Sequence, residues 1–492
     1  NDYAIGEKHG LEVIDVFNED GTLNKYGLEW NGLDRFEARQ KIAESLSDSG
    51  FLSKVEKYKS SIGTSERTGA IVEPRLSLQW WVNMQDLAKP ALGAIEDNEI
   101  RLIPDKFKNT YAHWMNNIKD WCVSRQLWWG HQIPAYFYGD DNQFVVALEP
   151  KEALVKAREA SGNNQLSLSD LRQDEDCLDT WFSSWIWPIS VFDGINNPNN
   201  KDLNYYYPTQ DLVTAPEILF FWVARMIMAG YEFTNVKPFE NVYLTGIVRD
   251  KKGRKMSKSL GNSPDPLELI NKYGADGVRM GMLLSSPAGN DLPFDEDLCL
   301  QGRNFSNKIW NALRLIDGWE VNESIEAGDA EKWAMNWFGE VLSRTLEDLN
   351  SDFEKYRLSE ALMRIYKLIW NDFCSWYLEL VKPTYGEPIA KDVFDQTKYF
   401  FDSIMKILHP FMPFITEEVW HLLSPTPGNK FINNEDWPNA RVNSIVYIEQ
   451  FTHVEELTTA LRTFRKEKNI AFKQGLDLRI KNDLPQGIAA VK

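Results

Sequence analysis

The segment from Arg249 to Lys258 constrains this chain more than any other stretch. It reads RDKKGRKMSK, so six of its ten residues are Lys or Arg, in a chain whose formal net charge is −18. An apolar, strand-like stretch from Val242 to Val248 precedes it, and a helix start follows. Asp265 is a suitable N-cap and Pro266 suits the first helical position. We therefore predict a basic loop between a strand and a helix, with Gly253 and Gly261 as pivots.

A lysine-rich loop of this kind is most often a solvated surface turn. The order KMSKS, from Lys255 to Ser259, favours a second interpretation, because it places two ammonium groups beside two hydroxyl groups. Such a loop can close over a polyphosphate, where a lysine acts as a point charge on the leaving group. The loop residues by themselves leave both interpretations open.

The extended string GRKMSKSLGNSPDP resembles the KMSKS signature of class I aminoacyl-tRNA synthetases. The resemblance implies that Lys258, with Lys255 in support, offsets charge on pyrophosphate as the amino-acid carboxylate attacks ATP. Met256, Ser257 and Ser259 complete the nucleotide-binding loop that the resemblance implies, and Mg²⁺ is expected to arrive with the ATP. Gly246, on the preceding strand, is then expected to let the backbone approach adenosine.

Composition narrows the class of protein. At 492 residues the chain is too long for one core, and about two to four domains are expected. No apolar run approaches the length of a membrane span, so no membrane partner is expected. The four cysteines are scattered without a C-x-x-C pair, which argues against zinc and for a reducing, cytoplasmic compartment. The negative net charge does not exclude a nucleic acid, because phosphate binding depends on local fields.

Two aromatic segments carry the candidate substrate pocket. One reads DTWFSSWIW from Asp179, and the other, EILFFWVARMIMAG, is predicted to form a buried helix that opens at Pro216. The residues alone favour core packing for Trp181, Ile218 and Trp222. Both strings resemble those of valyl enzymes, which implies that these three side chains line a valine pocket. Ile218 and Trp222 are expected one turn apart on one helix face.

Residues 1–75 are predicted to be the C-terminal remnant of an α/β editing domain. Val13–Phe17 is strand-like and Arg35–Phe51 has the pattern of an amphipathic helix. The opening string NDYAIGEKHGL resembles the end of the valyl editing insertion, which implies that Asp2 matches an aspartate that grips a mischarged amino group. The threonine-rich strands of that pocket are absent, so we expect no editing. The tryptophan pairs at 80–81 and 128–129 are predicted to pack.

From Gln301 onward the pattern is that of long helices. Apolar residues at steps of three or four predict an amphipathic helix ended by Pro383: Leu362, Ile365, Ile369, Phe373, Trp376 and Leu380. The string ILHPFMPFITEEVWHLL resembles the helix junction of class I anticodon-binding domains. Arg303, Lys308 and Arg314 share the first helix. They are either solvated surface charges or contacts to tRNA phosphates.

These patterns together predict an α/β plus all-α chain. The resemblance implies that it contains the C-terminal half of a Rossmann-like nucleotide-binding fold, the remnant of the editing domain and a helical anticodon-binding bundle. The expected boundaries are 1–75 for the editing remnant, 76–254 for the catalytic domain with insertions, 255–300 for the KMSKS loop and stem-contact region, 301–441 for the anticodon-binding domain and 442–492 for a small C-terminal junction segment.

The resemblance is closest to bacterial valyl enzymes. It implies ATP-dependent activation of valine to valyl-adenylate and transfer to tRNA(Val), by a monomer. The six histidines include no HxGH pair, the second motif of class I enzymes, so we expect this motif upstream of Asn1 and no activity from the chain alone. Two alternatives stay open: an isoleucyl-tRNA synthetase, or a non-catalytic tRNA-binding module. A P-loop ATPase has no support, because no P-loop is present.

Overall fold

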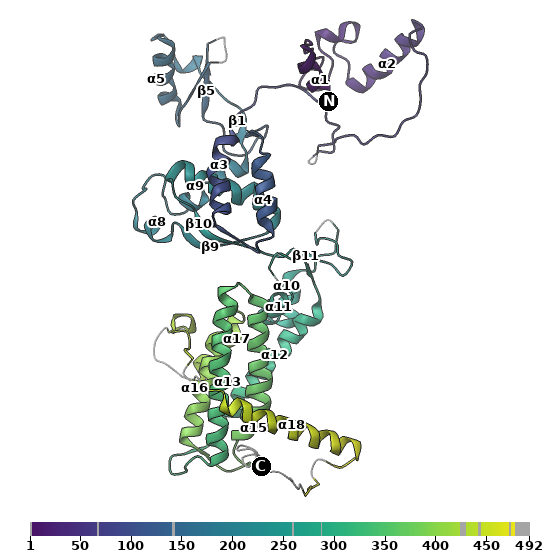
Figure 1. Cartoon of the computed structure of the whole chain (residues 1–492). Helices are drawn as coiled ribbons and strands as arrows, with labels where there is room; N and C mark the ends of the chain where they lie inside the picture. Colours follow the sequence, from purple (N-terminus) through teal and green to yellow (C-terminus); the bar gives the residue numbers. More distant parts are fainter. Residues whose placement is uncertain are drawn as a thin grey trace. The chain divides into compact units, whose positions relative to one another are not determined.

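The computed structural model describes residues 2–65, 68–139, 143–257, 260–286, 288–423, 430–440, 444–471 and 474–477. The chain divides into two compact units (Figure 1). Unit 1 comprises Asn1–Val82 and Trp121–Leu178, and unit 2 comprises Asn83–Asp120 and Asp179–Lys492. The polypeptide therefore leaves unit 1 to form one segment of unit 2, returns to complete unit 1, and then forms the rest of unit 2.

The first part of unit 1 contains α1 (Asp2–His9), the 3-10 helix η1 (Lys25–Trp30) and α2 (Arg35–Asp48). The predicted helix from Arg35 is confirmed, because the Asp34 side chain caps it by accepting a hydrogen bond from Phe36 N at 2.8 Å. The predicted strand at Val13–Phe17 is wrong. Only Phe17 pairs, in an isolated bridge with Leu23, since the described residues offer this segment no neighbouring strand to extend a ladder.

Short antiparallel sheets form the rest of unit 1. Their elements are β1 (Trp81–Val82) with β3 (Trp121–Cys122), β4 (Ser124–Arg125) with β8 (Cys177–Leu178), and the three-stranded sheet β6 (Gln143–Val146), β5 (Ala135–Tyr138) and β7 (Arg172–Gln173), together with α5 (Pro150–Ser161) and η2 (Leu168–Asp170).

Of the two tryptophan pairs that are predicted to pack, only Trp80 does so. Trp80 lies edge-on to Phe144 with 4.6 Å between ring centroids. Trp128 and Trp129 are fully exposed, at 106% and 92% of a free side chain, so packing is wrong for that pair. In this loop the backbone of Gly130, and neither indole, lies against Cys177, because a Cβ on Gly130 would come within 3.0 Å of the Cys177 Cβ.

Unit 2 begins with a three-stranded parallel sheet in the order β2 (Arg101–Ile103), β10 (Phe239–Leu244), β9 (Thr209–Thr214). Val242 of the central strand lies opposite both Leu102 and Leu212. Strand β10 is buried at all positions but Glu240, as expected for a parallel strand covered on both faces. The helices of this part of unit 2 are α3 (Met84–Glu96), α4 (Phe107–Asn116), α6 (Thr180–Ser184), α7 (Trp187–Ser190), α8 (Lys201–Tyr206) and α9 (Ala224–Thr234).

The predicted helix from Pro216 is not regular. It consists of a 3-10 turn, η3 (Pro216–Ile218), a π-helical turn, η4 (Leu219–Val223), and then α9. The run Ala224–Gly230 is buried throughout, so the prediction of a buried helix is confirmed for that part. The prediction of one regular helix face for Ile218 and Trp222 is wrong, because a π-turn widens the helix between them.

The region after the sheet joins the basic loop to the helical part. Strand β11 (Val248–Arg249) pairs in parallel with β12 (Leu292–Pro293), and α10 (Pro266–Tyr273) leads into α11 (Ala275–Leu284). Asp265 caps α10 by accepting from Leu267 N at 2.8 Å, as predicted. Helix α11 touches α12 (Glu296–Asp317) backbone to backbone. A Cβ on Gly302 would lie 2.6 Å from the Gly277 carbonyl oxygen, so only glycine allows this approach.

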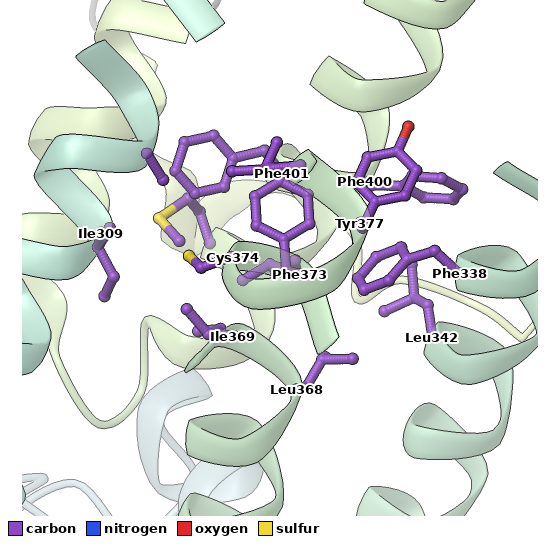
Figure 2. Packing of buried hydrophobic residues seen from close by; sticks show 14 of the residues in the cluster. Ile309, Phe338, Leu342, Leu368, Ile369, Phe373, Cys374, Tyr377, Phe400 and Phe401 are labelled. Carbon is purple, nitrogen blue, oxygen red and sulfur yellow. The ribbon is translucent and has the colours of Figure 1, made fainter. Parts of the chain in front are cut away.

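Long helices form the rest of unit 2: α13 (Asp329–Glu354), α14 (Leu358–Lys367), the π-helical η5 (Leu368–Tyr377), α15 (Leu378–Val381), α16 (Lys391–Leu408), α17 (Pro413–Leu423), the 3-10 turn η6 (Ile432–Asn434) and α18 (Val446–Glu467), with the short parallel pair β13 (Val321–Asn322) and β14 (Ile389–Ala390). The amphipathic helix predicted to end at Pro383 is confirmed, with a π-helical middle. Figure 2 shows its Phe373 and Tyr377 packed with Phe338 and Phe400 in the bundle core.

Across the described ranges, no helix combines the length and apolar character needed to cross a membrane.

Candidate active site

The basic loop begins as a tight hairpin. Asp250 N donates to Arg254 O at 2.9 Å, and Gly253 N donates to Asp250 O at 2.8 Å. Gly253 has a φ of 75°, which an L-residue rarely adopts, so glycine suits the predicted pivot. Met256 N then returns to Val248 O at 3.3 Å. The first half of the loop is therefore an ordered turn that folds back onto strand β11.

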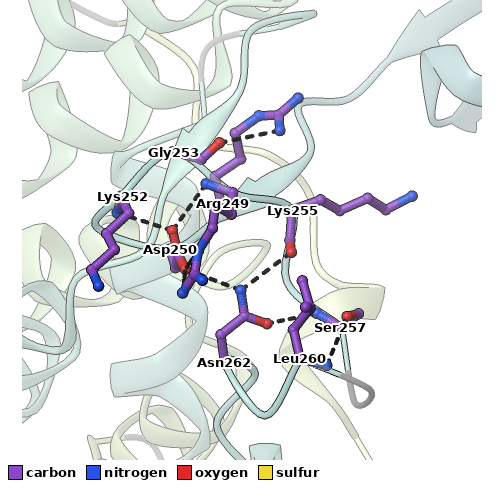
Figure 3. Close-up of polar contacts among 9 residues, drawn as sticks. Arg249, Asp250, Lys252, Gly253, Lys255, Ser257, Leu260 and Asn262 are labelled. Atoms are coloured by element: carbon purple, nitrogen blue, oxygen red, sulfur yellow. Dashed lines mark hydrogen bonds and ion pairs between the residues drawn. The ribbon is translucent and has the colours of Figure 1, made fainter. Parts of the chain in front are cut away.

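Two side chains outside the KMSKS string hold the loop in this shape (Figure 3). Asp250 accepts from the backbone N of Lys252 and of Arg254, both at 2.9 Å. Asn262 donates to Asp250 at 3.0 Å and accepts from Ser257 N at 2.9 Å. The hydrogen bond from Asn262, together with those from Arg254 and Lys252, holds the pKa of the Asp250 carboxyl well below its usual range. A permanent negative charge thus organises a positively charged loop.

Lys255 points out of the loop toward the second aromatic segment. Its Nζ lies 2.8 Å from Oε1 and 2.6 Å from Oε2 of Glu217, the residue that precedes Ile218. The structure therefore brings the loop into contact with the segment that carries a predicted pocket residue. Lys258 and Ser259 lie outside the described residues.

The three predicted pocket residues stand on three elements, α6, η3 and η4, and are each half-buried. Trp181, on α6, stacks on Phe221 with 6.2 Å between ring centroids. Trp222, on η4, donates from its indole N–H to the carbonyl oxygen of Ser184, at the end of α6, at 3.1 Å. This hydrogen bond fixes the orientation of the Trp222 ring. Ile218 is the last residue of η3, directly after Glu217.

Gly246 follows strand β10, as the sequence indicates, but its surroundings are the chain's own backbone. A Cβ built on this residue would overlap the carbonyl oxygen of Asn290. Nearby, Gly289 N donates to Leu244 O at 2.8 Å, which holds the two segments together. The close approach at Gly246 is therefore made by the segment that leads into β12.

The remaining predicted site residues have different surroundings. Arg303 donates to Lys272 O at 3.0 Å and so ties α12 to the end of α10. Lys308 lies over the Trp370 ring, 5.3 Å from its centroid, while Arg314 is exposed. Asp2 belongs to α1, and its side chain is not described.

Residues 10–295 match the family of class I tRNA synthetases (I, L, M and V), and residues 335–480 match the anticodon-binding domain of tRNA ligases. The first match covers more than half of the chain and includes both the sheet and the basic loop. The chain belongs to the class I tRNA synthetases.

Curated relatives agree with this assignment. The chain is 57% identical over 484 residues to a valine–tRNA ligase of Christiangramia forsetii, and 55% identical over 491 residues to one of Parabacteroides distasonis. These alignments cover 98% and 100% of the chain but 55% and 56% of the relatives. The synthetase chain thus spans about half the length of the curated relatives that it matches.

Solved synthetases share the fold. A methionyl-tRNA synthetase of Mycobacterium tuberculosis in complex with methionyl-adenylate aligns with a TM-score of 0.54 and 16% identity, over 90% of this chain and 84% of that one. A second structure of the methionyl enzyme from that organism aligns with a TM-score of 0.52 and 18% identity, over 74% and 66%. The predicted combination of a Rossmann-like catalytic domain and a helical anticodon-binding domain is confirmed.

Three residues of this synthetase site escaped the sequence reasoning: Asp250, Asn262 and Glu217. Asp250 and Asn262 had a usable signal, because an acidic residue and an amide flank a run of like charges that must be compensated. Glu217 had no signal, since its partner Lys255 is 38 residues away. Within the described part of the chain, no group of three or more His, Cys, Asp or Glu side chains is placed to hold a metal ion.

Proposed function

We propose that this chain is the part of a valine–tRNA ligase that carries the KMSKS loop, the valine pocket and the anticodon-binding bundle. The single observation that carries the proposal is the identity of 57% and 55% to two valine–tRNA ligases over nearly the whole chain. The enzyme would activate valine with ATP to valyl-adenylate, release pyrophosphate, and transfer valine to tRNA(Val). It would act as a cytoplasmic monomer.

In this proposal the loop acts on the leaving group. Lys258 and Lys255 place two ammonium charges where negative charge builds up on pyrophosphate, and ATP brings Mg²⁺ with it. Met256, Ser257 and Ser259 form the remaining loop contacts to the nucleotide. Preorganised charges are effective only if they do not have to rearrange, and the Asp250–Asn262 contact supports this by ordering the loop before the nucleotide arrives. Gly246 acts on the loop indirectly. Its lack of a side chain leaves room for the Asn290 carbonyl oxygen, just before β12, which pairs with the strand that leads into the loop.

The valine pocket would be walled by Trp181, Ile218 and Trp222. Two indoles and a branched aliphatic side chain suit an isopropyl group and exclude larger side chains by overlap. The hydrogen bond between the Trp222 indole and Ser184 O supports this role, because a wall that discriminates by size must not rotate away. Rigid walls convert a difference of one methylene into a difference in affinity.

The helical bundle would bind tRNA. The match of residues 335–480 to anticodon-binding domains supports this. Arg314 is exposed and available for a phosphate, and Lys308 can reach one from its place over Trp370. Arg303 would act structurally, because it is already bonded to Lys272 O. We retain the five proposed segments, 1–75, 76–254, 255–300, 301–441 and 442–492, with residues 1–75 as the editing remnant and Asp2 as its one matching site residue.

The test is valine-dependent exchange of pyrophosphate into ATP by the full-length protein that contains this chain. Valine is expected to support exchange at least about tenfold better than isoleucine at equal concentration, given what one extra methylene costs in a fitted pocket. Lys258→Ala is expected to abolish most exchange while affinity for tRNA(Val) is retained. Better exchange with isoleucine, or loss of tRNA binding with exchange intact, would overturn the proposal.

A further inference from the structure

Glu217 occupies a distinctive place among the carboxylates that pair with the basic loop. In the described residues, Arg254 pairs with Asp250 of the loop itself, and Arg249 and Lys251 pair with the Asp291–Asp295 segment beside it. Lys255 alone of these reaches the segment that bears the predicted valine pocket. The Glu217–Lys255 pair is therefore the direct charge contact between the nucleotide loop and the amino-acid side of the site.

Both backbones that carry this pair are held in place. On one side, Thr245 N donates to Thr214 O at 2.9 Å, which fixes the end of β9 just before η3 and Glu217. On the other, Asn262 donates to Lys255 O at 3.3 Å and so fixes the loop at the lysine. The side chains themselves are free to exchange partners, because they are 56% and 47% exposed. The two backbones are therefore fixed, whereas the contact between the two side chains can be replaced.

We propose that Glu217 is a positioning residue that holds the Lys255 ammonium until a polyphosphate takes its place. Both carboxylate oxygens lie within hydrogen-bond distance of Nζ, so Glu217 offers the ammonium two acceptors. A polyphosphate carries several negative charges and displaces a single carboxylate from a half-exposed ammonium. Each binding event therefore exchanges one anion for another on the same lysine. The inference rests on the proposed function, in which the loop receives ATP.

This role predicts the direction in which a change at Glu217 shifts the affinity for a polyphosphate. Glu217 competes with phosphate for Lys255, so removing its charge strengthens binding of a polyphosphate. The size of the effect is that of a half-exposed ion pair, which corresponds to about a two- to fivefold change in the dissociation constant. Because screening weakens the pair, the effect shrinks as salt is added.

The experiment is calorimetric titration of this chain with inorganic pyrophosphate at low ionic strength. Glu217→Gln is expected to lower Kd about two- to fivefold, and Glu217→Asp to stay near the original value. Asp291→Asn is the matched control, because it removes the same charge beside the loop from a carboxylate that pairs with Arg249 instead. It is expected to change Kd less than Glu217→Gln does. Far-UV circular dichroism of each variant verifies that the fold is unchanged.

A double-mutant cycle with Lys255→Met isolates the contact. In that background Glu217→Gln is expected to have no effect on pyrophosphate binding. The proposal is overturned if Glu217→Gln weakens binding or leaves it unchanged, if it acts equally in the Lys255→Met background, or if no variant binds pyrophosphate. In the full-length protein, Glu217→Gln is expected to lower the KM for ATP without raising kcat, a split that a merely structural residue would not produce.

The two proposals fail separately. Pyrophosphate binding needs neither valine nor tRNA. The titrations of the Glu217 and Lys255 variants therefore still test this inference if the full-length protein shows no valine-dependent exchange. Conversely, a double-mutant cycle that shows no coupling between Glu217 and Lys255 leaves the proposal of a valine–tRNA ligase intact.

Discussion

The side-chain amide of Asn262 lies 3.0 Å from the Asp250 carboxylate, so the two sides of the KMSKS loop are joined across twelve residues. The same amide accepts from Ser257 N at 2.9 Å. One small side chain therefore fixes the backbone of the string that is proposed to act on pyrophosphate. Lys255, one of the two lysines proposed to act on pyrophosphate, thus has its backbone held by a neighbour that does not itself need to touch the nucleotide.

Asn262→Ala is expected to lower kcat for valine-dependent exchange in the full-length protein by about ten- to hundredfold, because it releases the loop from its ordered shape. Thermal stability is expected to change little, since the loop is a surface feature. Ser263→Ala, at the exposed neighbouring position, is the control and is expected to retain full kcat. An unchanged kcat in Asn262→Ala would show that the loop does not need this restraint.

Trp222→Phe is expected to raise the KM for valine about tenfold with a smaller change in kcat. The substitution removes the indole N–H that donates to Ser184 O, and an unpaired carbonyl costs about 1–3 kcal/mol. Steady-state exchange at varied valine concentration measures the effect. The exposed Trp129, which belongs to neither α6 nor η4, provides the same substitution as a control, and Trp129→Phe is expected to leave KM unaltered.

Phe373→Ala is expected to destabilise the helical bundle by about 3–5 kcal/mol, because the ring is fully buried and its removal leaves a cavity. Figure 2 shows the ring within the core, and its centroid lies 5.3 Å from that of Phe401. Urea unfolding followed by circular dichroism measures the loss. Phe414, which is 65% exposed, is the matched position, and Phe414→Ala is expected to cost less than about 1 kcal/mol. Equal losses at the two positions would contradict the predicted core.

Asp372 is expected to make the bundle less stable as the pH rises. Burial, with the nearby charge of Glu455, raises the pKa of its carboxyl to about 7. In the unfolded chain the same carboxyl has a pKa of about 3.9. The folded state therefore keeps a proton that the unfolded state loses between about pH 4 and pH 7. Stability falls across that window and levels off above it.

Asp372→Asn removes this dependence. It is expected to raise the free energy of unfolding by about 2–4 kcal/mol at pH 8 and to change it little at pH 4. Urea unfolding at a series of pH values provides the measurement. Glu455→Gln, which removes only the neighbouring charge, is expected to give a smaller gain at pH 8. A stability profile of Asp372→Asn parallel to that of the unsubstituted chain would refute the assignment.

Local signals predicted several elements correctly. The N-cap at Asp265 and the helix from Arg35 depend on residues that lie within one turn of each other, so the sequence contains the whole interaction. The apolar spacing from Leu362 to Leu380 likewise predicts which face is buried. The strand at Val13–Phe17 failed because a strand needs a partner that the local pattern does not reveal.

The site was predictable only in part. The KMSKS string and the three pocket positions are visible by resemblance, whereas the π-turn between Ile218 and Trp222 is not. A π-turn arises from how a helix packs against its neighbours, and no residue in LFFWV demands it. The exposure of Trp128 and Trp129 was missed for a related reason, because large apolar side chains are usually buried and only the path of the backbone past Gly130 placed them outside.

The amino-acid order by itself determined the class I family, the basic loop, its helix cap and the helical character of the second half. The family follows from the resemblance of the KMSKS string, and the other properties follow from contacts between near neighbours and from side-chain spacing. Tertiary structure alone decided three contacts. Glu217 pairs with Lys255, the Asn290 carbonyl oxygen lies against Gly246, and the Trp222 indole donates to Ser184 O. Each of these contacts joins segments that are distant in the chain, and their geometry exists only after the sheet and helices have packed.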